Sequence, residues 1–522
     1  MSKTILSRQI WIVDFGSQYT QLITRKTREL GFSSEIITPK RTSELLKEGH
    51  KPKAFVLSGG PSSVSLDGKD YSDIFESGCP VLGICYGMQL MARHFGGSVE
   101  KGVQGEYGHA QVHGAEGFKV PGIGGGTEIN VWMSHFDHVA TVPDDFNVIL
   151  KSQNQLNAAI KHNTKPLVGL QFHPEVEHTE HGKEILNYFY VEVSHLRQDW
   201  SSLEMLNEAK NLVKEVGDTK VLCAFSGGVD SLVAATLAHD ILGDNLYCFF
   251  VDNGLLRPQD YTHIRTLVES TNLNIEIIDA RKEFLGKLVG LGDPEDKRKK
   301  IGNTFIETFE QKVHEFEENQ GITFTHLLQG TLYPDVIESI SPHNDNGMSV
   351  TIKSHHNVGG LPERMKLKLL EPLRYLFKDE VRKLGEELNL KHEWVYRHPF
   401  PGPGIGIRVL GSLSEPAIEK VQKSDQILFE ELHAQHLYES IWQAFTVLLP
   451  VNTVGVKGDA RAYEQVICLR LVNSTDGMTA TWSDVPREFL TKVSNRITNE
   501  VAGVTRVVYD ITSKPPGTIE WE

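Results

Sequence analysis

Two short glycine-flanked motifs of this 522-residue chain carry side chains that can do chemistry. The first is Gly83-Ile84-Cys85-Tyr86-Gly87, and the second is Ser226–Ser231, with the sequence Ser-Gly-Gly-Val-Asp-Ser. A thiolate at a helix N-terminus is a nucleophile that can release ammonia from an amide. A glycine-rich loop presents backbone N–H groups to a phosphate. The two motifs together predict one enzyme that makes a C–N bond in two places.

The cysteine motif needs a base, and the sequence offers one. The apolar run Val81–Ile84 predicts a strand and Met88–Phe95 a helix, so Cys85 falls on the sharp turn between them. His173 and Glu175 follow another strand-like run. Residues two apart in an extended segment point to the same side, so His173 can meet Cys85 while Glu175 orients the imidazole.

An oxyanion hole completes this prediction. Backbone N–H groups of Gly59, which follows a third strand-like run, and of Tyr86 are the candidate donors. The alternative interpretation is a buried cysteine and a core histidine with no chemical role. Gly-x-Cys-x-Gly with His-Pro-Glu resembles the class I glutamine amidotransferases over about residues 8–195. The resemblance implies that Cys85 forms a γ-glutamyl thioester, that His173 relays the proton and that Glu175 holds His173.

The second motif directly follows the strand-like run Val221–Phe225 and precedes the helical stretch Leu232–Leu242. It is not a Walker A loop, because no Gly-Lys-Ser/Thr ends it. Asp230 beside phosphates suggests a Mg²⁺ ligand or a role in the fold of the loop. The motif resembles the PP-loop of the N-type ATP pyrophosphatases, which grips the departing pyrophosphate. That resemblance assigns ATP binding to Ser226, Gly227, Gly228, Val229, Asp230, Ser231 and Leu232, although Leu232 stands where the family often has Ser or Thr.

Strands alternating with helices on both sides of residue 199 predict the fold class. We expect two doubly wound α/β domains, an amidotransferase domain at 1–198 and a PP-loop domain resembling adenine-nucleotide hydrolases at 199–398. The Pro/Gly-dense segment 399–404 stops regular structure. The remainder, 399–522, predicts a smaller α+β domain for dimerisation and xanthosine 5′-monophosphate (XMP) binding.

The order of these parts resembles the family of glutamine-hydrolysing GMP synthases over the whole chain. Segments 293–299, 329–335, 353–360, 377–380, 455–459 and 513–522 carry this resemblance. It implies that ATP adenylates XMP, that ammonia from glutamine then gives GMP, and that the enzyme is a homodimer using Mg²⁺. The resemblance assigns XMP contacts to Arg298, Gln443, Asp459, Lys514 and Glu520, and a mobile lid to the segment with Lys353 and Lys378.

Bulk composition restricts the other possibilities. The chain is 39% hydrophobic and 23% charged, with a net charge of −15, so no broad basic surface for nucleic acid is expected. Five widely spaced cysteines argue against a disulfide framework and fit a reducing cytoplasm. The first residues lack the apolar region of a signal peptide, and no stretch is long enough to span a bilayer.

Two rival functions remain at this stage. The first is an adenylating amidotransferase with another acceptor, which pyrophosphate release with XMP against nicotinic acid adenine dinucleotide would separate. The second is a binding or regulatory protein that kept the folds without the chemistry. Intact Cys85, His173, Glu175 and the complete glycine-rich loop argue against it.

Overall fold

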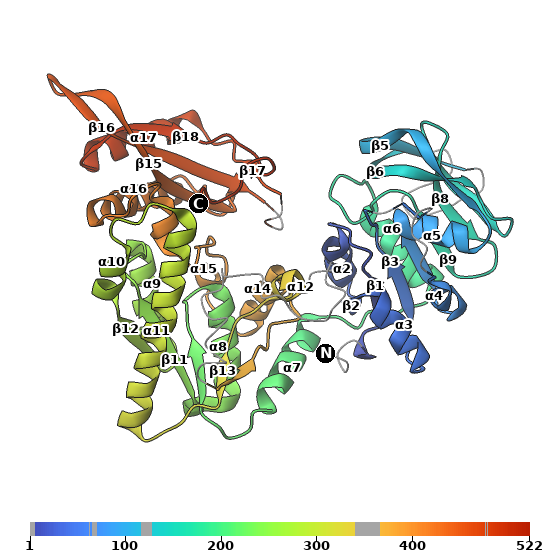
Figure 1. The fold of residues 1–522 in the computed structure, drawn as a ribbon, viewed down its shortest axis with the longest axis horizontal. Helices are drawn as coiled ribbons and strands as arrows, with labels where there is room; N and C mark the ends of the chain where they lie inside the picture. The colour runs from blue at the N-terminus through green and yellow to red at the C-terminus, as the bar shows by residue number, and fades with distance from the viewer. Residues whose placement is uncertain are drawn as a thin grey trace. The chain divides into compact units, whose positions relative to one another are not determined.

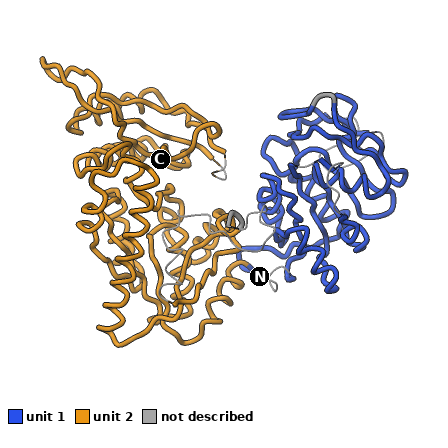
Figure 2. Tube along the Cα trace, in the orientation of Figure 1, with its two compact units in different colours: residues 1–204, 342–347 blue, residues 205–341, 348–522 orange. Residues whose placement is uncertain are grey.

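The computed structural model describes residues 6–61, 63–64, 70–115, 128–339, 366–474, 477 and 479–522. The described residues form two compact units, one holding residues up to 204 and the other holding residues from 205 onward (Figure 2). Among these residues, no helix combines the length and apolar content needed to cross a membrane.

The first unit is built on a nine-stranded mixed sheet (Figure 1). Its order is β2-β1-β3-β4-β9-β8-β7-β5-β6, and the first five strands are parallel. Strands β1, β3, β4 and β9 are buried along their whole length, as expected of strands covered by helices on both faces. The strands are β1 Ile10–Val13, β2 Ser34–Ile37, β3 Ala54–Leu57, β4 Val81–Ile84, β5 Ser98–Gly114, β6 Glu128–Thr141, β7 Phe146–Ser152, β8 Asn157–His162 and β9 Leu167–Leu170.

The helices of this unit follow the parallel strands. They are α2 Thr20–Glu29, α3 Pro39–Lys47, α4 Ser72–Glu76, α5 Tyr86–His94 and α6 Gly182–Tyr188. Helix α3 shows how local chemistry sets their ends: Thr38 accepts a hydrogen bond from the Arg41 N–H, and Pro39 occupies the first turn, where no N–H is needed. The antiparallel strands β5–β8 extend the sheet, and the strand–helix alternation did not predict them.

The second unit contains a five-stranded parallel sheet of order β12-β11-β10-β13-β14. The order reverses between β10 and β13, so this edge of the sheet is the usual ligand position of a doubly wound fold. The strands are β10 Val221–Ala224, β11 Leu246–Asp252, β12 Ile275–Asp279, β13 His326–Leu328 and β14 Lys368–Leu370. The helices are α7 Ser202–Lys214, α8 Val229–Leu242, α9 Pro258–Ser270, α10 Arg281–Leu288, α11 Pro294–Gln320, α12 Tyr333–Ser339, α14 Lys378–Glu387 and α15 His392–Val395.

The C-terminal part of this unit is an α+β assembly. Its sheet pairs β15 antiparallel with β16, and β16 parallel with β18. The elements are α16 Glu415–Ala434, β15 Gln443–Lys457, β16 Ala460–Asn473, β17 Thr481–Trp482, α17 Arg487–Glu500 and β18 Val504–Tyr509. The predicted fold class, two α/β sheets followed by an α+β segment, is confirmed.

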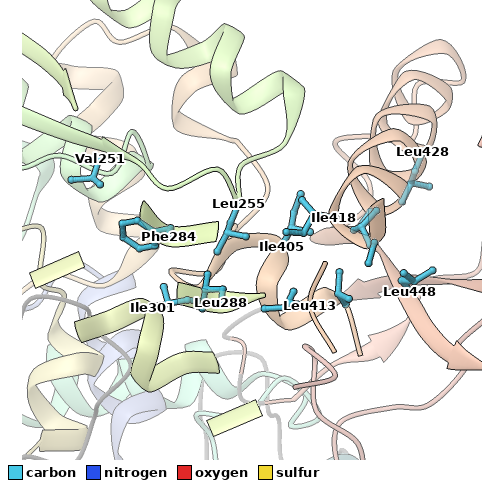
Figure 3. Packing of buried hydrophobic residues seen from close by; sticks show 14 of the residues in the cluster. Val251, Leu255, Phe284, Leu288, Ile301, Ile405, Leu413, Ile418, Leu428 and Leu448 are labelled. Atoms are coloured by element: carbon cyan, nitrogen blue, oxygen red, sulfur yellow. The ribbon is translucent and has the colours of Figure 1, made fainter. Parts of the chain in front are cut away.

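One hydrophobic core runs from the parallel sheet into the C-terminal elements. Phe284, Leu288 and Ile301 lie in the same buried cluster as Ile418 and Leu448 (Figure 3). Leu255 and Ile405 lie between the two groups in that view. The segments before and after residue 399 therefore share their packing.

Candidate active sites

Cys85 lies on the turn between β4 and α5 with a backbone φ of +52°. This conformation is uncommon for a residue with a side chain and is typical of strained functional turns. Glycine is required on either side. A Cβ on Gly83 would meet the Gly87 carbonyl carbon at 2.5 Å, and a Cβ on Gly87 would meet the Leu57 carbonyl oxygen at 2.5 Å. The motif therefore encodes a turn so tight that only glycine fits next to the nucleophile.

His173 and Glu175 lie just beyond the end of β9, as the sequence predicted. The His173 Nδ1 and the Glu175 Oε1 are 2.8 Å apart, and both side chains are buried. The Thr179 hydroxyl donates to the His173 carbonyl at 2.6 Å and fixes the segment. Because Nδ1 faces the carboxylate, Nε2 is the ring nitrogen left for Cys85, whose side chain is hydrogen-bonded to the imidazole. The structure thus brings the three predicted residues together.

The charge state of His173 follows from this arrangement. Burial alone lowers the pKa of His173, but the Glu175 charge and hydrogen bonds to Cys85 and Glu175 outweigh it and raise the pKa to about 10. The imidazolium is therefore the main form at neutral pH. Since the folded pKa lies above 6.5, this group stabilises the fold fully below pH 6.5, and the contribution disappears as pH rises through about 10.

Replacing Glu175 with glutamine is expected to reverse this balance. Without the carboxylate charge, burial dominates and the pKa of His173 falls, so the protonated imidazole is lost at lower pH. The alkaline limb of glutamine hydrolysis should then move from near pH 10 to a value about two units lower, with roughly tenfold slower hydrolysis at pH 9. Glutamate formation against pH measures the effect. Glu184→Gln, at an exposed position of α6, is the control, and an unmoved limb in Glu175→Gln would contradict the assignment.

The two predicted oxyanion donors flank the catalytic side chains. Tyr86 directly follows the nucleophile at the start of α5. Gly59 lies beside the imidazole, because a Cβ there would meet the His173 Cε1 at 3.3 Å. The Ser58 hydroxyl donates to the Gly59 carbonyl at 2.8 Å and accepts from the Phe15 N–H at 3.0 Å, which fixes the turn after β3. Both backbone segments are thus held next to the sulfur and the imidazole.

The structure adds a contact to the nucleophile that the sequence did not predict. The Gln171 amide nitrogen lies 3.6 Å from the Cys85 sulfur, and its amide oxygen accepts from Gln89 at 3.4 Å. On another side the sulfur faces the Ser134 carbonyl at 3.7 Å. A carbonyl favours the neutral thiol as donor, whereas the amide N–H favours the thiolate. Gln171 precedes His173 by two residues, and this spacing was the only available signal.

The glycine-rich loop closes around two hydroxyls. Ser231 Oγ accepts from the Ser226 N–H at 3.3 Å and lies 3.0 Å from both the Ser226 Oγ and the Gly228 carbonyl. Gly227 has a φ of +72°, and Gly228 caps α8. Leu232 is fully buried and its N–H already donates to Gly228, so its part is to pack the loop. The loop lies at the carboxyl end of β10, where the strand order reverses.

Behind the loop, a second set of contacts holds Gly227. The His263 Nε2 lies 3.1 Å and the Arg397 Nη1 3.5 Å from its carbonyl oxygen. The Arg397 Nη2 also meets Asp260 at 2.6 Å. Burial and the Arg397 charge lower the pKa of His263 to about 4, so the neutral ring donates its Nε2–H. These residues come from α9 and the segment after α15, and no local motif marks them.

Asp230 is the candidate metal ligand. Its Oδ2 meets the Lys378 ammonium at 2.5 Å, while its Oδ1 is buried with no hydrogen-bond partner. A carboxylate oxygen left uncoordinated beside a phosphate loop fits Mg²⁺, which uses one or two carboxylates plus substrate phosphates. Among the residues that the structure describes, no three acidic, histidine or cysteine side chains gather as a ready metal site. Lys378 begins α14, and Lys353, the other lid residue, lies outside the described residues.

The residues predicted to bind XMP fall into a cluster and an outlier. Gln443 donates to Glu520 at 2.9 Å, and the fully buried Arg408 meets the same carboxylate at 2.9 Å. The Arg298 guanidinium donates to the Glu522 carbonyl, and Lys514 donates to the Gly477 carbonyl at 2.8 Å. Asp459, in contrast, is exposed in the turn between β15 and β16. Arg408 is the member of this cluster that the sequence did not predict.

Comparison with known proteins agrees with this division of labour. Residues 11–193 match the model of class I glutamine amidotransferases, residues 203–290 that of NAD synthase, and residues 430–521 that of the GMP synthase C terminal domain. A solved structure from Thermoplasma acidophilum, described there as one subunit of a GMP synthase, is 34% identical, covering 36% of this chain and 93% of that chain, with a TM-score of 0.31.

Full-length relatives extend the match to the whole chain. The glutamine-hydrolysing GMP synthase of Chlorobaculum tepidum is 49% identical over 99% of both chains. That of Aquifex aeolicus is 50% identical over 99% of both chains. A thiol site, a phosphate loop and a C-terminal segment of this family thus occur in the same order and over the same length, and the chain belongs to the family of glutamine-hydrolysing GMP synthases.

Proposed function

We propose that this protein converts XMP to GMP, using ATP and ammonia that it releases from glutamine. The observation that carries the proposal is the buried contact of Cys85, His173 and Glu175 in the same chain as a complete phosphate loop. Glutamine and water give glutamate and ammonia in the first unit. In the second unit, XMP and ATP give adenyl-XMP and pyrophosphate, and ammonia then displaces AMP.

The first half-reaction uses charges already in place. The Cys85 sulfur, paired with imidazolium His173, attacks the glutamine amide carbon, and the Gly59 and Tyr86 N–H groups receive the oxyanion. His173 gives its proton to the departing ammonia and then takes one from the water that opens the thioester. Glu175 keeps the ring oriented throughout, as the 2.8 Å contact allows.

The second half-reaction is centred on the loop after β10. Backbone N–H groups and the hydroxyls of Ser226 and Ser231 hold the β and γ phosphates, while the XMP oxygen attacks the α phosphate and pyrophosphate leaves. Mg²⁺, held by Asp230 together with the phosphates, would supply charge neutralisation at the leaving group. Lys378 and the lid residue Lys353 are positioned by the same proposal to neutralise phosphate charge and exclude water.

The XMP site is proposed at the C-terminal cluster. Arg298 and Lys514 supply cationic donors for the phosphate. Gln443 and Glu520 supply a donor and an acceptor for the ribose or base, with Arg408 holding Glu520 in place at 2.9 Å. Asp459 is part of this site only through a neighbouring protomer, because its own chain places it at the far turn of the β15–β16 hairpin.

A homodimer is proposed through that hairpin. Its outer part, from Val451 to Tyr463, carries four exposed apolar side chains: Val451, Val454, Val456 and Tyr463. Grouped apolar exposure of this kind on a protruding β-ribbon is typical of interaction surfaces. The protein is therefore expected in the cytoplasm as a dimer whose hairpins are covered.

Charge placed on the hairpin should break the dimer. The double variant Val456→Asp with Tyr463→Asp buries two carboxylates in an apolar interface, which costs several kcal/mol. We expect it to be a monomer at micromolar concentration by light scattering, whereas the natural sequence is a dimer. Val289→Asp, at an exposed apolar position outside the hairpin, is the control. A dimer of unchanged stability in the double variant would place the interface elsewhere.

One experiment tests the proposed function as a whole. Pyrophosphate and glutamate are measured with ATP and glutamine, in the presence and in the absence of XMP. We expect pyrophosphate only when XMP is present. Release with nicotinic acid adenine dinucleotide in place of XMP would establish the rival acceptor, and the absence of any acceptor-dependent ATP cleavage would indicate a binding protein.

A further inference from the structure

A pocket of about 760 Å³ lies in the second unit, outside both proposed catalytic sites. Its walls come from the first turns of α9, from α15 and the residues after it, and from the end of α16 with the turn that follows. No residue of the phosphate loop and no member of the XMP cluster lines it. Its volume is in the range of pockets that hold small-molecule ligands.

One wall of the pocket ends in a stack of aromatic rings. Tyr438 lies between two histidines, with ring centroids 4.1 Å from His398 at 8° and 4.3 Å from His433 at 19°. His398 closes the buried end of this column, whereas His433 is exposed and lines the pocket. A second stacked pair, His392 and Tyr396, lines the pocket at a centroid distance of 4.3 Å. A planar ring placed on His433 would continue the column.

The floor of the pocket carries unused hydrogen-bonding groups. Arg257 is almost fully buried, and Asp260 accepts from its Nε and Nη2 at 2.8 Å and 3.0 Å. Its Nη1 has no hydrogen-bond partner, since the closest carboxylate, that of Asp425, is 3.7 Å away. Gln259 also lines the pocket, and both polar atoms of its amide are without a partner. Buried polar groups in folded proteins are rarely left unpaired, so these point to a bound group.

We propose that this pocket binds a purine nucleoside monophosphate, at a site separate from the phosphate loop. The base stacks on His433, and the phosphate lies toward the guanidinium groups of Arg257 and Arg397. Rotation of the Gln259 side chain brings its amide donor and acceptor to an edge of the base, a pairing that carboxamides make well with purines. The acidic lining residues Glu393 and Glu439 are acceptors for ribose hydroxyls.

The pocket is mechanically connected to the phosphate loop. Arg397 and His263, which both line the pocket, are the two side chains that hold the Gly227 carbonyl, at 3.5 Å and 3.1 Å. A phosphate that engages Arg397 weakens one of these two contacts. Ligand in the pocket therefore changes the affinity of the loop for ATP, and ATP changes the affinity of the pocket by the same factor.

Site-specific histidine modification tests the proposal on the full chain. Diethyl pyrocarbonate modifies exposed histidines, and the rate at each is followed by mass spectrometry with millimolar AMP, GMP or inorganic phosphate. We expect AMP or GMP to slow modification of His433 by about tenfold. His314, exposed on α11 outside the pocket, is the internal control and should be unaffected. Gln259→Ala should weaken the protection at His433.

Each outcome decides the proposal. Unchanged modification of His433 with both nucleotides would overturn it, and so would equal protection by inorganic phosphate alone, which would indicate a simple anion site. Protection that persists undiminished in Gln259→Ala would overturn the role of the amide. None of these readouts depends on GMP synthesis, so they are separate from the test of the proposed function.

Discussion

Cys85→Ala is expected to abolish GMP formation from glutamine and to leave formation from ammonium within twofold of the natural rate. Alanine keeps the Cβ that the turn already accommodates at φ +52°, so the fold of the elbow is unchanged. Only the sulfur is lost, and without it no thioester can form. The ATP-dependent half-reaction belongs to residues of the other unit and is untouched.

The measurement is the rate of GMP formation with either nitrogen source. Cys79→Ala is the matched control, because Cys79 is another buried cysteine of the same unit, with its sulfur 3.3 Å from the Pro52 carbonyl. It should retain both activities. A Cys85→Ala protein that is folded but inactive with both glutamine and ammonium would show that the two sites are not chemically separate.

Asp230→Asn is expected to lower pyrophosphate release by about 10²–10³-fold with either nitrogen source, the usual cost of losing a charged group that acts on a transition state. The change removes the charge opposite Lys378 and the free Oδ1 that suits Mg²⁺. Alkylation of Cys85 by iodoacetamide should stay unchanged, because that site lies in the other unit. The predicted phenotype is therefore the converse of Cys85→Ala.

Asp240→Asn is the control for this variant, since Asp240 is an exposed carboxylate of the same helix and pairs with Lys210 at 3.4 Å. It should behave as the natural sequence does. If Asp230→Asn keeps its rate at saturating Mg²⁺ and ATP, the carboxylate serves only the fold of the loop, and the metal assignment is wrong.

Local signals were sufficient for the reactive centres. The glycines beside Cys85 and inside the phosphate loop are fixed by steric contacts of neighbouring segments, so the motif and its geometry carry the same information. His173 and Glu175 were predictable because strand geometry places alternate residues together. The fully buried strands β1, β3, β4 and β9 also appear in the sequence as short apolar runs.

The remaining features depend on contacts between distant segments. Strands β5 to β8 have mixed burial, for example an alternating pattern in β6, and this weaker period was masked by their polar faces. Gln171 reaches Cys85 over 86 positions, and Arg397 reaches Gly227 over 170. Arg408 is fully buried between Phe400, Phe445 and Glu520, an environment that only the folded chain creates. No composition or spacing rule predicts such pairs.

The continuous core shown in Figure 3 has a consequence for dissecting this protein into fragments. A cut near residue 204 separates two pieces that each keep their own apolar interior, and both pieces should melt cooperatively in a calorimeter. A cut near residue 399 would instead strip Leu255 and Ile301 from Ile405 and Ile418 and leave two sticky half-interiors that aggregate. Gene fusions, truncations and interdomain grafts in this family therefore have one permissive junction, and it lies before α7.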